Sequence, residues 1–161
     1  MSILDAEIIY TALQRASALI VVGHEEPDGD CVASQLVLGE YFLSTGKTVG
    51  IFSSGPFHRK EISQFSSRFE TTISPELLRQ NPTVVLLDCS TLSRTGSLAQ
   101  QIQNHHTIVI DHHIEDTESK FFGDLRFVEP SAPATAYLVQ LILEAGGVRL
   151  NSDQAKLLMT M

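Results

Sequence analysis

Three side chains that can bind a metal ion stand close together near the N-terminus. His24, Asp28 and Asp30 fall within seven residues, directly after an apolar run. Pro27 and Gly29 flank Asp28, which favours a tight turn that can aim the three side chains at one point. A single Asp in this place would more simply cap the following helix. Three potential ligands at this spacing favour metal binding instead.

Further candidates follow two later apolar runs. Asp88 comes directly after TVVLL, and Asp111, His112 and His113 come directly after TIVI. An ionised carboxylate beside such a run is costly unless it is paired or bound to a metal. The simpler alternatives are a strand-end cap for Asp88 and solvated loop residues for the histidines. The polar residues before TIVI, His105 among them, are expected to be solvated.

Together these positions offer up to four carboxylates and two or three imidazoles. Carboxylates this close raise the pKa of one another unless cations neutralise them. Oxygen ligands with some imidazole suit Mn²⁺ or Mg²⁺ better than structural zinc. This many ligands can hold two ions, and two ions roughly 3.5–4 Å apart act as a clamp for phosphoryl displacement. The chemistry indicated is hydrolysis of a phosphoester.

The overall charge constrains how a phosphorylated ligand could be bound. The chain has 19 acidic and 11 basic residues, a net charge of −8, which argues against a broad cationic surface for nucleic acid. Divalent cations would attract phosphate locally despite this charge. His58, Arg59 and Lys60 form a small cationic cluster, which is better explained as a solvated loop than as a substrate contact.

Alternating apolar strands and helices must position these residues. The strands are expected at residues 18–23, 47–53, 83–87 and 107–110, and the helices at 31–44, 97–103, 134–145 and 152–161. Near-continuous apolar strands between helices predict an α/β fold with a mostly parallel sheet flanked by helices, in three layers. Ligands of such sheets bind beyond the carboxyl ends of the strands, which is where the candidates fall. Residues 55–67 are predicted to form a mobile connection.

The 161 residues amount to one domain, with 43% hydrophobic residues. No apolar run approaches the roughly 20 residues needed to cross a bilayer, and the first residues lack the basic region of a signal peptide. Cys31 and Cys89 are expected to be buried apolar residues rather than a disulfide framework. A cytoplasmic protein without a membrane partner is the expectation.

At this point the motifs resemble those of a known family. HEEPDGD, Asp88 within VVLLDCS, and the DHH triplet at residues 111–113 look like the first three motifs of the DHH phosphoesterases, in order and spacing. The resemblance covers Ile20 to about Gly147. Residues 94–96 and the segment FVEPSAPATAYLVQLILEAGG look most like the branch of nanoRNases and 3′-phosphoadenosine 5′-phosphate (pAp) phosphatases.

The resemblance implies the N-terminal domain of a DHH phosphoesterase, with a dinuclear site, usually of manganese and with Mg²⁺ as an alternative. His24 and Asp28 would hold one ion, Asp30 and His112 the other, and Asp88 would bridge them. The substrate would be a short oligoribonucleotide or a nucleotide phosphate such as pAp. A homodimer is compatible with the resemblance.

Two further residues would serve catalysis in this family. His113 would face the substrate phosphate or protonate the leaving oxygen, and Asp111 would orient an imidazole. The alternatives are a manganese-dependent inorganic pyrophosphatase, a cyclic-dinucleotide phosphodiesterase, and a metal-binding domain with impaired catalysis. The pyrophosphatase is disfavoured by the segment near Pro130, and the phosphodiesterase by the lack of membrane and sensor segments.

The resemblance stops before the family's fourth motif, an Asp just beyond the last expected helix. Residues 1–161 are therefore expected to be a single domain, truncated before that motif and before a C-terminal substrate-binding domain. Asp116 and Glu118 are attributed to a solvated loop and not to a replacement ligand. The chain is expected to bind one Mn²⁺ better than a second and to hydrolyse dinucleotides slowly or not at all.

Overall fold

One parallel sheet organises the protein. The computed structural model describes residues 3–114 and 122–160, and within them five strands pair in the order β2-β1-β3-β4-β5, all parallel. The strands are β1 (Ala18–Gly23), β2 (Thr48–Phe52), β3 (Thr83–Leu87), β4 (Thr107–Asp111) and β5 (Leu125–Val128). From β1 the chain passes to β2 at one edge of the sheet and then to β3 on the other side of β1. This reversal places a topological switch point between β1 and β3, where a ligand site is expected.

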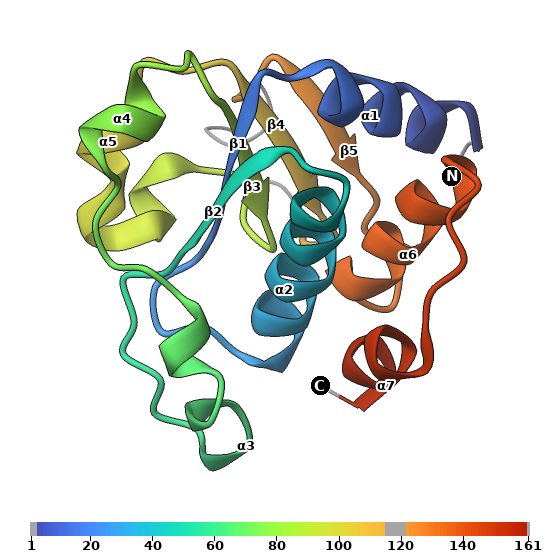
Figure 1. The fold of residues 1–161 in the computed structure, drawn as a ribbon. Helices are drawn as coiled ribbons and strands as arrows, with labels where there is room; N and C mark the ends of the chain where they lie inside the picture. The colour runs from blue at the N-terminus through green and yellow to red at the C-terminus, as the bar shows by residue number, and fades with distance from the viewer. Residues whose placement is uncertain (1–2, 115–121, 161) are drawn as a thin grey trace.

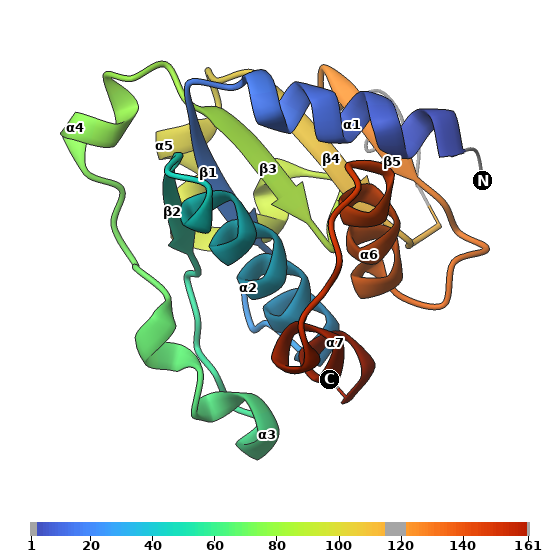
Figure 2. The same cartoon turned by 45° about the vertical axis from the view of Figure 1, so that its right-hand side comes forward.

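Helices cover both faces of the sheet (Figures 1 and 2). The elements are α1 (Ile3–Arg15), α2 (Gly29–Ser44), α3 (Lys60–Ser63), the 3₁₀ helix η1 (Ser66–Arg68), α4 (Pro75–Leu78), the 3₁₀ helix η2 (Leu92–Leu98), α5 (Ala99–Ile102), α6 (Thr135–Ala145) and α7 (Ser152–Thr160). Helices α1, α2 and α6 share a core with one face of the sheet. Helices α4, η2 and α5 share a core with the other face. The predicted three-layer α/β fold is confirmed.

The two cores follow from the two-residue period of a strand. Leu19 and Val21 of β1 pack with α1, α2 and α6, whereas Ile20 and Val22 pack on the opposite side. All six residues of β1 are buried. A strand buried on both faces needs apolar residues throughout, which explains the continuous run that predicted it.

Several elements differ from the sequence prediction. Helix α1 and strand β5 were not predicted, and the connection expected at residues 55–67 contains α3 and part of η1. The helix expected at residues 97–103 is a 3₁₀ helix followed by the short α5, with a break at Gly96, whose φ is +60°. Asp116, Glu118 and Met161 lie outside the described residues. No helix in the described ranges is long and apolar enough to span a bilayer.

Candidate metal centre

The candidate ligands gather beyond the carboxyl ends of three neighbouring strands. His24 directly follows β1, Asp88 directly follows β3, and Asp111 is the last residue of β4. The order β1-β3-β4 makes these three strands adjacent. The clustering expected from the sequence is therefore present in the structure, beside the switch point of the sheet.

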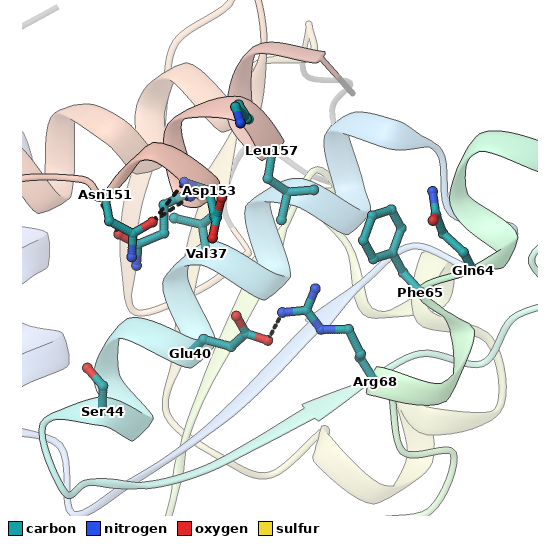
Figure 3. Close-up of a pocket in the computed structure, with 11 residues that line it drawn as sticks. Val37, Glu40, Ser44, Gln64, Phe65, Arg68, Asn151, Asp153 and Leu157 are labelled. Carbon is teal, nitrogen blue, oxygen red and sulfur yellow. Dashed lines mark hydrogen bonds and ion pairs between the residues drawn. The ribbon is translucent and has the colours of Figure 1, made fainter.

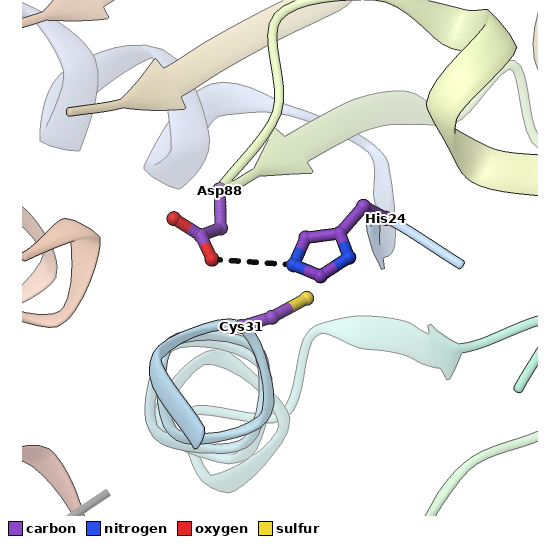
Figure 4. Close-up of side chains that lie close together, drawn as sticks. All are labelled: His24, Cys31 and Asp88. Carbon is purple, nitrogen blue, oxygen red and sulfur yellow. Dashed lines mark ion pairs between the residues drawn. The ribbon is translucent and has the colours of Figure 1, made fainter. Parts of the chain in front are cut away.

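Asp88 lies at the middle of the cluster. Its side chain is 1% exposed, and its two carboxylate oxygens face different imidazoles. Oδ2 lies 3.5 Å from Nε2 of His24 (Figure 4), and Oδ1 lies 3.8 Å from Nε2 of His112. The backbone of Asp88 has a φ of +61°, a left-handed conformation that non-glycine residues rarely adopt. Strain of this kind is found mainly at functional sites.

Both imidazoles are held with Nε2 toward the carboxylates. Nδ1 of His24 lies 2.8 Å from the carbonyl oxygen of Glu25, and Nδ1 of His112 lies 3.3 Å from that of Ala132. A carbonyl oxygen only accepts, so each Nδ1 carries the proton and donates it. In the neutral form of either ring, the lone pair is therefore on Nε2, the atom that faces Asp88, and this is the form that binds a metal ion. This is how metal-binding histidines are usually oriented.

Asp28 serves the local structure and also faces the cluster. It is the N-cap of α2, and its Oδ1 accepts a hydrogen bond of 3.1 Å from the amide of Cys31. The same Oδ1 lies 4.0 Å from Nε2 of His24. The capping role and the ligand role are thus compatible, because an ionised carboxylate has about four acceptor positions.

Asp30 connects α2 with α6. Its Oδ2 accepts from the amide of Thr135 at 2.8 Å, and its Oδ1 accepts from the amide of Ala136 at 2.7 Å. Oδ2 also lies 3.5 Å from Nε2 of His112. Burial raises the pKa of Asp30, and the negative charge of Asp88 raises it further. A cation between these two carboxylates would relieve both effects.

Asp88 responds differently to burial. Burial by itself would raise its pKa, but hydrogen bonds from His24 and Thr135 outweigh this and hold the pKa below its ordinary value. Burial by itself would lower the pKa of His24, but Asp88 and the carbonyl of Glu25 outweigh this and raise the pKa above its ordinary value. The centre therefore keeps a buried negative charge on Asp88, beside positions that favour a cation.

His113 is held by Asp111. Nδ1–H of His113 donates to Oδ1 of Asp111 at 2.8 Å, and the backbone amide of His113 donates to the same oxygen at 3.1 Å. The other oxygen of Asp111 accepts from the hydroxyl of Ser90 at 2.7 Å. Asp111 is 2% exposed, whereas the His113 side chain is 55% exposed. Nε2 of His113 is thus left as the free ring nitrogen of a partly exposed imidazole.

The donor set fits divalent metal ions. Among the described residues, two groups of donors have their ligand atoms within 4.8 Å of one another: His24, Cys31 and Asp88 form one, and Asp88, His112 and His113 form the other. Asp88 belongs to both groups; the Cys31 thiol and the Nδ1–H of His113 carry protons, which leaves Asp88 and the two histidines His24 and His112 as the donors of these groups. Carboxylate oxygens with neutral imidazole nitrogens suit Mn²⁺ or Mg²⁺.

Cys31 lies beside the centre as a buried packing residue (Figure 4). Its Sγ lies 3.5 Å from Oε1 of Gln35, to which the thiol donates. Burial raises the pKa of the Cys31 thiol well above its usual range, so it stays protonated. Cys89 is also buried and packs in the core on the α4–α5 side of the sheet. Both observations agree with the sequence prediction.

Gly23 allows α2 to approach the end of β1. A Cβ on Gly23 would lie 2.2 Å from Sγ of Cys31 and 2.8 Å from Oε1 of Gln35. We expect Gly23→Ala to lower the free energy of unfolding by about 1–3 kcal/mol, the usual cost of overpacking. Urea titration followed by circular dichroism measures the loss. Adding Cys31→Ala should recover part of it, and a Gly23→Ala protein as stable as wild type would contradict this account.

A separate cleft of about 730 Å³ lies between α2, α7 and residues 64–68 (Figure 3). An ion pair between Glu40 and Arg68 crosses it, and Asp153 and Lys156 of α7 also line it. Its lining includes none of the candidate metal ligands. The cationic cluster predicted to be a solvated loop lies outside both sites, and its His58 is 4.0 Å from Glu26 with both side chains exposed.

Sequence reasoning missed two residues that contact the centre and a buried polar residue, Gln35, that packs beside it. Thr135 and Ser90 donate hydroxyl hydrogen bonds to Asp88 and Asp111, and Gln35 donates from Nε2 to the carbonyl of Phe52 at 2.8 Å. Ser and Thr are common in loops and at helix starts, so their type carried no signal. Gln35 was detectable as a polar residue within an apolar helix face.

The fold is a parallel α/β sheet with a cluster of potential metal ligands at its carboxyl edge, and the comparisons identify the family. The model of the DHH family, N-terminal domain, matches residues 18–160. The chain therefore belongs to the DHH family. The bifunctional oligoribonuclease and PAP phosphatase NrnA of Thermus thermophilus is 29% identical over 143 residues, which cover 88% of this chain and 41% of that protein.

Solved structures show the same fold. An exopolyphosphatase-related protein from Bacteroides fragilis superposes with a TM-score of 0.79 at 20% identity, covering 99% of this chain and 49% of that one. RecJ from Thermus thermophilus, solved in complex with Mn²⁺, gives a TM-score of 0.52 at 20% identity and covers 97% and 22%. The chain thus spans less than half the length of each of these proteins.

Proposed function

We propose that the chain is the metal-binding domain of a phosphoesterase that hydrolyses short oligoribonucleotides, pAp, or both. The observation that carries the proposal is the position of Asp88, with one carboxylate oxygen toward His24 and the other toward His112. A carboxylate placed between two imidazoles is suited to bridging two divalent ions. Family membership supports the same reaction class.

The proposed ligands divide between two positions. His24 and Asp28 would hold one ion, Asp30 and His112 the other, and Asp88 both. The contacts of 3.5–4.0 Å between these side chains agree with that division, because atoms bound to one ion at about 2.1 Å lie roughly 3–4 Å apart. Two such ions, when bound, polarise the phosphate and lower the pKa of water at the site.

His113 is the proposed catalytic residue. Asp111 accepts the Nδ1 proton of His113 and thereby fixes the ring. Its Nε2 is available to face the substrate phosphate or to deliver a proton to the leaving oxygen, the role of a general acid. Asp111, which is buried and hydrogen-bonded on both oxygens, would act through His113 rather than on the substrate.

Manganese is the proposed cofactor, with Mg²⁺ as an alternative. The RecJ structure similar to this chain contains Mn²⁺, and the oxygen-rich donor set accepts either ion. The net charge of −8 also supports bound cations, since they would let an acidic protein attract phosphate. We place the protein in the cytoplasm, where its two free, buried cysteines would stay reduced.

A parallel assay tests the proposed function. The chain is incubated with Mn²⁺ and a diribonucleotide, pAp or pyrophosphate, with protein in excess of substrate so that a slow reaction is detected. We expect release of mononucleotide from the diribonucleotide, of phosphate from pAp, or both, and no product after removal of Mn²⁺ with EDTA. Phosphate released from pyrophosphate alone would replace the proposal with a pyrophosphatase. Tight Mn²⁺ binding without any product would replace the proposal with a metal-binding domain that lacks catalytic activity.

A further inference from the structure

The start of α6 holds two of the proposed metal ligands at once. Thr135, its first residue, is fully buried, and its hydroxyl donates to Oδ1 of Asp88 at 2.8 Å. The amides of Thr135 and Ala136 donate to the two oxygens of Asp30. Ala134, at the N-cap position of α6, makes no side-chain capping bond. Asp30 of α2 therefore caps α6. Thr135 lies between the carboxylate of Asp30 and that of Asp88, which follows β3.

The hydroxyl of Thr135 restrains a carboxylate that would otherwise rotate. The last torsion of an Asp side chain has a broad energy profile, so packing or hydrogen bonds must fix the plane of the carboxylate. In this structure Thr135 binds Oδ1 of Asp88, the oxygen that lies 3.8 Å from His112. Oδ2 is then directed toward His24. No other side-chain hydroxyl within the described residues donates to Asp88.

We propose that Thr135 is a positioning residue whose hydroxyl fixes the plane of the Asp88 carboxylate, so that one oxygen faces each histidine and both ion positions form together. This rests on the proposed function, because it assigns Thr135 a role toward the same two ions. The hydroxyl does not reach the substrate in this role. Its effect is on metal affinity and on the bridge between the ions.

The test compares variants that remove or keep the hydroxyl. Thr135→Val removes it at nearly constant shape, and Thr135→Ser keeps it. Mn²⁺ binding is measured by electron paramagnetic resonance, which reports free Mn²⁺ during titration and the spin coupling of two bridged ions. We expect Thr135→Val to weaken Mn²⁺ binding by about 10–100-fold, the usual effect of losing a partner of a metal ligand. The spin-coupling signal should be lost in this variant, and Thr135→Ser should bind within about threefold of wild type.

Thr107→Val is the matched control. Thr107 is also buried, and its hydroxyl donates to the carbonyl of His105 at the opposite end of β4. It should leave Mn²⁺ binding unchanged. Melting temperatures of the metal-free proteins check folding, and Thr135→Ala replaces the Val variant if that one does not fold.

The outcomes separate this inference from the proposed function. Wild-type affinity and spin coupling in a folded Thr135→Val or Thr135→Ala protein would overturn the role of Thr135 alone. Equal losses in the Ser and Val variants would also overturn it, because the hydroxyl would then not be the active group. A wild-type protein that binds no Mn²⁺ would overturn the metal centre itself, and the proposed function with it.

Discussion

Asp88→Asn is expected to weaken the binding of both metal ions strongly while leaving the volume of the side chain almost unchanged. The hydroxyl of Thr135 can still donate to the amide oxygen, which leaves the amide nitrogen toward His24. That nitrogen carries protons and no charge, so neither ion keeps the bridging carboxylate. We expect Mn²⁺ affinity to fall by more than the ~10–100-fold that follows loss of an outer partner, measured by titration and by metal content after dialysis.

Asp30→Asn is the comparison for this prediction. Asp30 lies 3.5 Å from His112, and its ion-pair contact in the centre is with that histidine, so its replacement should weaken mainly the second ion. Asn can also cap α6 through its side-chain oxygen, which limits the loss of stability. Equal retention of Mn²⁺ by the two variants would show that Asp88 does not bridge.

His113→Gln is expected to separate catalysis from metal binding. The Nδ1 proton of His113 is committed to Asp111, so this nitrogen, which lies 3.7 Å from Asp88, has no lone pair to offer an ion. Mn²⁺ affinity should therefore stay near that of wild type. Turnover of the diribonucleotide or of pAp should fall by about 10²–10⁴-fold, the usual contribution of a general acid, as measured in single-turnover assays.

Two further variants control the His113 experiment. His58→Gln changes an exposed histidine beside Glu26 and should leave turnover and metal binding unchanged. Asp111→Asn should lower turnover without loss of Mn²⁺, since it frees the His113 ring but removes no proposed ligand. Loss of Mn²⁺ from His113→Gln would instead make His113 a metal ligand and refute its role as the proton donor.

The central strands and the position of the site could be predicted because their physical signals are local. Strands β1, β3 and β4 are buried on both faces, which requires the apolar runs visible in the sequence. Their carboxyl ends meet at one edge, so the residues after each run had to lie near one another. His24, Asp88 and His112 meet there for this reason.

Other features depend on contacts that no short segment displays. Strand β5 has four residues at the edge of the sheet, and of these only Phe127 is buried, so it lacks the apolar run of a central strand. Helix α1 is an exception. Its buried residues Ala6, Ile9 and Leu13 recur at helical spacing, so this helix could have been predicted from the sequence. To cap α6, Asp30 contacts the amides of Thr135 and Ala136, which lie 105 and 106 positions later in the chain. The left-handed backbone of Asp88 likewise has no signal in its residue type.

We expect the capping of α6 by Asp30 to form late in the folding of the protein. A contact between residues 105 positions apart closes a long loop, which costs chain entropy and delays its formation relative to local helices. The loop that carries His24 and Asp28 can thus form before α6 docks, whereas Asp30 gains its two amide partners only afterwards. The amide protons of Thr135 and Ala136 exchange slowly with solvent only while that docking persists. Their exchange rates therefore measure how stably α6 is docked against Asp30.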